Sequence, residues 1–145
     1  MFLKMSLLFN FKTMRNSVEY TVLDAKWATG VWANILAEDF WNVVFSFATD
    51  GWADAALTVK FQWSIQETAP DFSAAQSVTN QWDYIEVIDL EDGSAIDWDT
   101  WIAVATADDY RLLEANINAL KWVNARVTAR TAWEVTVKAK LFNNQ

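Results

Sequence analysis

One acidic stretch, DLEDGSAIDWD at residues 89–99, holds the side chains best suited to chemistry. Its carboxylates are hard oxygen ligands of the kind that Ca²⁺ prefers, and Gly93 permits the sharp turn that a calcium loop requires. The spacing departs from the calcium-loop pattern D-x-D/N-x-D/N-G, because Glu91 and Asp92 are adjacent immediately before the glycine. We therefore favour a solvated acidic turn over a metal site. The carboxylates concerned are Asp89, Glu91, Asp92, Asp97 and Asp99.

Paired carboxylates could also serve a glycosidase, in which one acts as acid and the other as base or nucleophile. The acids of this chain concentrate in predicted turns, away from the buried aromatic surroundings that raise a carboxyl pKa. The chain has no cysteine and no histidine, which excludes disulfides, thiolate nucleophiles, ordinary zinc sites and Ser-His or Cys-His catalysis. We therefore expect a protein that is not an enzyme, and we assign no catalytic, cofactor-binding or metal-binding residue.

Tryptophan is the other residue type that could form a binding site, since the chain contains 10 tryptophans and only 3 glycines. Exposed indoles at loops and strand ends could stack on sugar rings, as they do in carbohydrate-binding modules. The tryptophans in such places are Trp52, Trp98, Trp101 and Trp133. By contrast, Trp63, Trp82 and Trp122 lie within strand patterns and are predicted to belong to the core.

The excess of tryptophan over glycine has a second explanation. Average glycine usage is about 7%, and the glycines and tryptophans together come close to that usage plus one or two genuine tryptophans. Some bacterial lineages and their phages read UGA as glycine, and translating such a gene with UGA as tryptophan produces this imbalance. Residues 131–133 lie between two strong strand patterns, where a tight turn favours glycine. Codons separate the two explanations, because UGG favours binding indoles and UGA favours misread glycines.

The totals of the chain narrow the class of protein further. At 145 residues and 53% hydrophobic content it fits one globular domain. A net charge of −8 argues against nucleic acid and against an anionic membrane surface. The run MFLKMSLLFNF is about half the length of a membrane span, and its lone Lys4 and lack of a cleavage site do not fit a signal peptide. We interpret residues 1–16 as an extension, with Met14 as an alternative start, before a single domain at 17–145.

Alternation of apolar and polar residues with period two predicts strands along most of this domain. The segment 108–122 could form an amphipathic helix, but we favour a strand that ends near Asn118. Turn signals at 49–51, 68–73, 91–94 and 106–109 separate the strands. The predicted strands are 17–23, 42–49, 56–65, 82–90, 100–106, 110–117, 121–129 and 133–142. This spacing predicts an all-β, antiparallel β-sandwich or jelly-roll-like barrel of about eight strands.

The same alternation predicts which side chains are buried. In the strand 56–65, Leu57, Val59, Phe61, Trp63 and Ile65 share the buried face, while Thr58, Lys60, Gln62 and Ser64 face solvent. Aromatic residues at other strand positions complete the core. The aromatic residues expected to supply much of it are Tyr20, Phe45, Phe47, Phe61, Trp82, Tyr84 and Trp122.

Several ordered motifs at residues 42–142 carry a family resemblance. The chain contains KFQWS, APDF, QWDYI, DWDTW, NALKWVNA and AWEVTVKA. It resembles a family of small β-rich proteins encoded among the virion structural genes of tailed phages and prophages, whose members read KFQGS, APDF, QWDYI, DGDTG, NGLKWVNA and AGEVTVKA. Where this chain has Trp63, Trp98, Trp101 and Trp133, the members of the family have glycine. Where it has Trp82 and Trp122, they have tryptophan too. Ala119 also replaces a usual glycine, which recoding does not explain.

The resemblance implies a context rather than a mechanism. It leads us to expect a non-enzymatic virion component, assembled in the host cytoplasm, that docks on a capsid, tail or fibre. Its partners would be other virion proteins and copies of itself, with the strand 135–142 and the N-terminal segment as docking edges. The alternative is a carbohydrate-binding module that binds glycans through exposed tryptophans, and a glycosidase ranks third.

Overall fold

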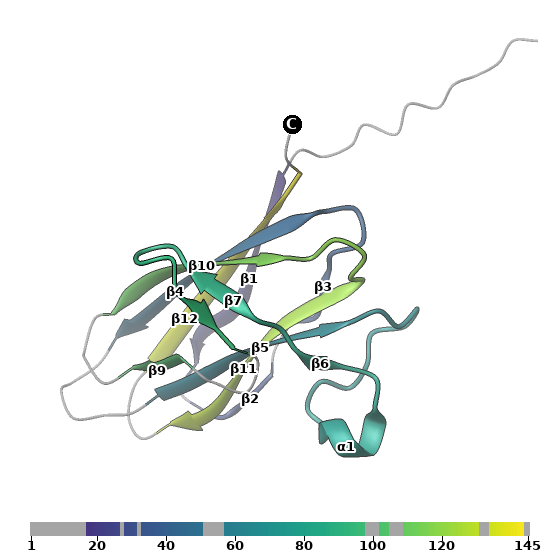
Figure 1. Cartoon of the computed structure of the whole chain (residues 1–145). Coiled ribbons are helices and arrows are strands. Elements are labelled where there is room, and N and C mark those ends of the chain that lie inside the picture. The colour runs from purple at the N-terminus through teal and green to yellow at the C-terminus, as the bar shows by residue number, and fades with distance from the viewer. Residues whose placement is uncertain are drawn as a thin grey trace, which may run out of the picture.

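Buried and partly exposed residues alternate along β4 (Asn42–Asp50), as they do in other long strands of the molecule. Val43, Phe45 and Phe47 are completely buried and point to one side, while the residues between them are partly exposed on the other. The computed structural model describes residues 17–26, 28–31, 33–50, 57–97, 102–104, 109–130 and 134–143. Within these residues, two antiparallel sheets pack face to face (Figure 1).

The long strands form the centre of each sheet and short strands form most of the edges. Sheet A runs β1 (Ser17–Lys26), β12 (Glu134–Phe142), β4, β10 (Tyr110–Asn116), β7 (Val87–Asp89) and β8 (Ala95–Ile96). Sheet B runs β2 (Gly30–Val31), β11 (Trp122–Arg130), β5 (Leu57–Ser64) and β6 (Asp83–Tyr84). In addition, β3 (Ile35–Leu36) pairs with β11, and β9 (Ile102–Val104) pairs with β5. One short helix, α1 (Gln76–Thr79), follows β5.

The core lies between the two sheets and is almost entirely aliphatic and aromatic. Phe45 of sheet A stacks on Phe61 of sheet B, with ring centroids 4.2 Å apart. Strand β1 pairs in sheet A. A bulge after Thr21 lets it bury two consecutive residues, Val22 and Leu23, in the core between the sheets. The chain then passes to β2 in sheet B. One core therefore joins both sheets.

The structure confirms an all-β antiparallel sandwich, and the two sheets do not close into a barrel. The helix considered at 108–122 is not formed, because β10 occupies Tyr110–Asn116 as an extended strand. Two of its apolar residues, Leu113 and Ala115, face the core, and Leu112 faces outward. The predicted aromatic core is confirmed at Phe45, Phe47 and Phe61, whereas Trp82 is buried but outside this core.

Other details of the sequence prediction are wrong. Residues 82–90 do not form one strand: β6 pairs with β5 in sheet B, and β7 pairs with β10 in sheet A. Tyr20 is 37% exposed rather than buried, because it lies on the edge strand of sheet A. Tyr84 and Trp122 are only partly buried, and Ile65, expected on the buried face, is 61% exposed beyond the end of β5.

A second cluster, which we call the outer cluster, lies on the side of β5 that faces away from the core. Gln62 and Ser64, expected in solvent, are buried there beneath Phe72 and Trp82. The Gln62 side-chain amide donates to the Phe72 carbonyl oxygen at 3.1 Å, and the Ser64 hydroxyl donates to the Gln81 carbonyl oxygen at 2.6 Å. The backbone of the connection between β5 and β6 therefore accepts from the Gln62 amide N–H and the Ser64 hydroxyl, whereas Gln62 Oε1 and Trp82 Nε1 are buried without a hydrogen-bond partner.

Candidate functional site

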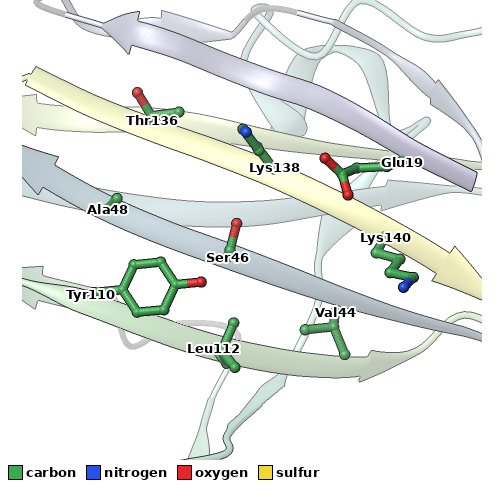
Figure 2. Close-up of a pocket in the computed structure, with 9 residues that line it drawn as sticks. All are labelled: Glu19, Val44, Ser46, Ala48, Tyr110, Leu112, Thr136, Lys138 and Lys140. Carbon is green, nitrogen blue, oxygen red and sulfur yellow. The ribbon is translucent and has the colours of Figure 1, made fainter.

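The outward side of sheet A carries a broad surface depression. Side chains from β1, β12, β4 and β10 line an open depression of about 470 Å³ on it, which we call the open face. Figure 2 shows Val44, Ser46 and Ala48 from β4 beside Tyr110 and Leu112 from β10. Strand parity places these residues there, since their neighbours Phe45, Phe47 and Leu113 point into the core.

One edge of the open face is apolar. Tyr110 is 62% exposed, and Leu112, Ile88 and Leu90 are each 40–44% exposed. Ile88 lies opposite Glu114 across the β7–β10 pairing, and the Leu90 backbone N–H donates to the Leu112 carbonyl oxygen at 2.9 Å. These four residues form a continuous exposed group, which we call the apolar strip. Contiguous apolar side chains of this kind mark interaction surfaces in many proteins.

The opposite edge of the open face is charged. Glu19 of β1 lies directly across from Lys140 of β12, and Lys138 lies across from Thr21. Figure 2 shows the Glu19 carboxylate and the two lysines on the same side of the sheet. Opposite charges at directly facing positions stabilise a strand pair modestly. The open face therefore offers a partner an apolar edge and a cationic edge with one carboxylate.

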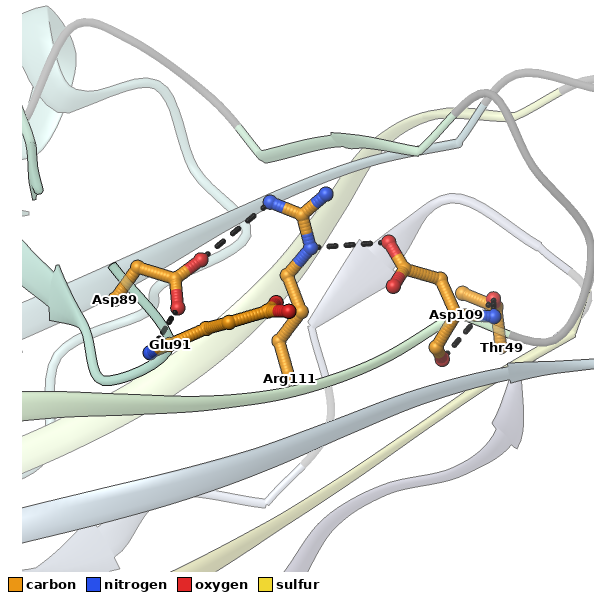
Figure 3. A network of polar contacts seen from close by, with 5 residues as sticks. All are labelled: Thr49, Asp89, Glu91, Asp109 and Arg111. Atoms are coloured by element: carbon orange, nitrogen blue, oxygen red, sulfur yellow. Dashed lines mark hydrogen bonds and ion pairs between the residues drawn. The ribbon is translucent and has the colours of Figure 1, made fainter. Parts of the chain in front are cut away.

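A polar network supports the strands beneath the apolar strip (Figure 3). Arg111 lies on the core-facing side of β10, at the end of the sandwich, and its guanidinium contacts two carboxylates. Its Nε is 3.0 Å from Asp109 Oδ2, and its Nη1 is 3.5 Å from Asp89 Oδ2. The Asp109 backbone N–H donates to Thr49 Oγ1 at 3.0 Å, which ties the network to β4. Because Asp89 is 5% exposed, Arg111 neutralises a charge that would otherwise be buried alone.

The acidic stretch at 89–97 organises a turn. Asp89 accepts a hydrogen bond from the Glu91 backbone N–H at 2.9 Å, and Asp92 accepts one from the Ser94 backbone N–H at 2.8 Å. Donation by Ser94 holds the pKa of Asp92 below its ordinary value. Within the described residues, no three acidic side chains gather as a metal site would require. Asp97 is exposed, and Asp99 lies outside the described residues.

The described tryptophans are mostly packed. Trp63 and Trp122 donate their indole N–H groups to the carbonyl oxygens of Tyr84 and Gln66, each at 2.9 Å. Trp82 is buried in the outer cluster, and only Trp41, at 53%, is strongly exposed among the described tryptophans. Those expected to form a sugar-binding surface, Trp52, Trp98, Trp101 and Trp133, lie outside the described residues. The part of the chain that is described therefore contains no array of exposed indoles.

Sequence reasoning missed the apolar strip, although a signal for it was present. Two consecutive apolar residues occur in each of the two strands, Val87-Ile88 and Leu112-Leu113. In a strand with one solvated face, such a pair must expose one of its members. The composition of the strand predicted at 82–90 is β-branched and aromatic enough for burial on both faces or for a barrel corner, and neither interpretation predicts the exposure of Ile88.

Comparison with known proteins gives a fold relationship. No protein-family model matches the chain, and no curated protein sequence matches it. The crystal structure of the SPBc2 prophage-derived protein YomS superimposes with a TM-score of 0.58 over 86% of this chain and 91% of that one, at 14% sequence identity. The chain therefore shares its sandwich fold with a protein derived from a prophage.

In the described residues, no helix is long and apolar enough to cross a membrane.

Proposed function

We propose that this protein is a non-enzymatic structural protein of a tailed phage, which docks on another virion protein through the open face. The observation that carries the proposal is the fold shared with a prophage-derived protein over 86% of the chain. The family motifs at residues 42–142 support the same context. The exposed apolar strip on an otherwise regular sheet supports docking as the mode of action.

The open face has the features of a protein-binding surface. An apolar edge with an exposed tyrosine provides buried area and an aromatic anchor, and Lys138 and Lys140 provide a charged rim. The protein would act in the virion after assembly in the host cytoplasm. Its partner is a virion protein that presents apolar residues beside a carboxylate, matching the two edges of the open face.

Incorporation into particles tests this function. Tagged protein is supplied in trans during growth of the phage that encodes it, and purified particles are probed for the tag. We expect wild-type protein in the particles and at least a tenfold loss for Leu112→Lys, since a charge in the centre of an apolar contact must be desolvated. Ile65→Lys, at a similarly exposed residue of the other sheet, should be incorporated normally. Absence of the wild-type protein from particles contradicts the proposal.

We also infer that Trp52, Trp98, Trp101 and Trp133 stand for glycines encoded by UGA. The support for this inference is the glycine that the family has at positions 98, 101 and 133; Ala119, at another family glycine, adopts φ +68° and is an ordinary substitution that recoding does not explain. Trp63 is a weaker case, because its indole is accommodated with a hydrogen bond. Peptides of the native protein across 95–104, read by mass spectrometry, should contain glycine at 98 and 101. Tryptophan at both would exclude recoding and favour the glycan-binding alternative.

A further inference from the structure

Strand β1 leaves one side of sheet A open. Its only partner among the described residues is β12, and from Ser17 to Thr21 its register with β12 is regular. Bulges occur only after Thr21. The outward main-chain groups of this half of β1 therefore have the spacing that a further strand would pair with. The other described edge strands contain two or three residues each, too few to accept a strand of comparable length.

Tyr20 is exposed on a side of the sheet where residues are normally buried. It lies opposite Ala139, which is completely buried, and it has the same parity as Val22, also completely buried. It is nevertheless 37% exposed, because no described strand lies beyond β1 to cover it. A strand added at this edge would cover the ring on the side that solvent now occupies.

We propose that two copies of this protein pair antiparallel through β1, about a two-fold axis at Tyr20. Each Tyr20 then faces the partner's Tyr20, and each Glu19 faces the partner's Thr21. The two A sheets become one continuous sheet, with both open faces on the same side. An interface of this kind uses one surface patch twice, as a two-fold dimer requires.

Charge complementarity selects a second copy and this register. In each copy, Lys140 faces Glu19 and Lys138 faces Thr21. With the axis at Tyr20, Glu19 has Lys140 of its own copy on one side. On the other side it faces the partner's Thr21, and the partner's Lys138 lies one strand further on. With the axis at Glu19, two carboxylates would face each other directly, which is unfavourable. The register at Tyr20 therefore adds opposite charges across the interface and avoids like charges.

This pairing uses the edge of sheet A and leaves the apolar strip of the open face free, so it goes beyond the docking function and can fail independently of it. The regular half of β1 forms three cross-strand pairs about this axis, which bury less area than a standard interface, and we expect a dissociation constant on the order of 10 µM. Sedimentation velocity of the full chain, from sub-micromolar to millimolar concentration, should show a monomer–dimer equilibrium.

The variant Tyr20→Lys tests whether the β1 edge forms the dimer interface. It places two ammonium groups face to face and should raise the dissociation constant at least tenfold, while an exposed lysine at a sheet edge leaves the monomer folded, as circular dichroism will check. Trp41→Lys, at an exposed aromatic residue just before β4, which β12 separates from β1, should dimerise as the wild type does. A protein that stays monomeric, as it would if residues 1–16 covered this edge, overturns the proposal. So does a dimer that Tyr20→Lys leaves intact.

Cross-linking tests the register without relying on a destabilised variant. The chain has no cysteine, so Tyr20→Cys creates a single thiol that lies opposite itself across the axis. Directly opposed residues have Cβ atoms about 4.5–5.5 Å apart, which is close to the spacing that a disulfide spans. Under glutathione redox buffer, we expect a covalent dimer for Tyr20→Cys and a monomer for Trp41→Cys. Equal cross-linking of both variants overturns the proposed axis.

Discussion

Ala119 adopts a backbone conformation that suits glycine better than alanine. It is the second central residue of the turn between β10 and β11, where the Leu120 backbone N–H donates to the Ile117 carbonyl oxygen at 2.9 Å. Its φ is +68°, as a type II turn requires at this position. We expect Ala119→Gly to raise the free energy of unfolding by about 1 kcal/mol, measured by urea denaturation. Ala119→Val should lower it; a gain for valine would contradict the explanation.

Asp92 illustrates how one neighbouring residue, Ser94, lowers the pKa of a carboxyl group in a turn. The Ser94 side chain and backbone both donate to its carboxylate and lower its pKa. A lowered pKa means that the carboxylate stabilises the fold above its unfolded pKa, and that this contribution is lost as the pH falls through the folded pKa. Carboxyl NMR titration should show a raised Asp92 pKa in Ser94→Ala. Asp71, whose pKa is lowered mainly by the Ser73 side chain, should not change.

Strands β4, β7 and β10 are held together at one end of the sandwich by a few polar contacts. Arg111 contacts Asp89 and Asp109, and its side chain is 32% exposed. Arg111→Met keeps the aliphatic stem but leaves Asp89 without its cation, so we expect a loss of about 2 kcal/mol in stability. Adding Asp89→Asn should recover part of that loss, as a double-mutant cycle will measure. Purely additive effects would show that the two side chains are not coupled.

The connection between β5 and β6 behaves as a packed element rather than a loose loop. Phe72 is 1% exposed, and its ring lies 6.1 Å from that of Trp82. Phe72→Ala should therefore cost about 3 kcal/mol in unfolding free energy, measured by chemical denaturation. Ile65→Ala, at a 61% exposed residue, should cost less than about 0.5 kcal/mol. A small effect at Phe72 would mean that the outer cluster contributes little to stability.

The long strands were predictable because each follows the period-two pattern of a sheet with one buried face. The division of residues 82–90 between two sheets was not, because a change of sheet at Ile85–Glu86 leaves the local composition unchanged. The burial of Gln62 was also not predictable, since its partner is a carbonyl oxygen ten residues further along the chain. Likewise, the apolar strip emerges only when β10 and β7 are paired.

At the scale of the whole molecule, β1 joins the two sheets through one core, since it pairs in sheet A and leads into β2 of sheet B. Unfolding should then be a single cooperative event. We expect the circular dichroism and tryptophan fluorescence transitions in urea to coincide. Separate transitions for the two probes would mean that the sheets unfold independently.

The unequal edges of the sandwich also determine how far association can proceed. A fibril requires two long, complementary strand edges on each molecule, so that every added copy presents a new one. In the part of the chain that is described, only β1 offers more than three residues at an edge. Two copies that pair through β1 use up each other's edge, and the assembly closes at two. Under the proposed pairing, a chain rich in β-structure is thereby protected from open-ended growth.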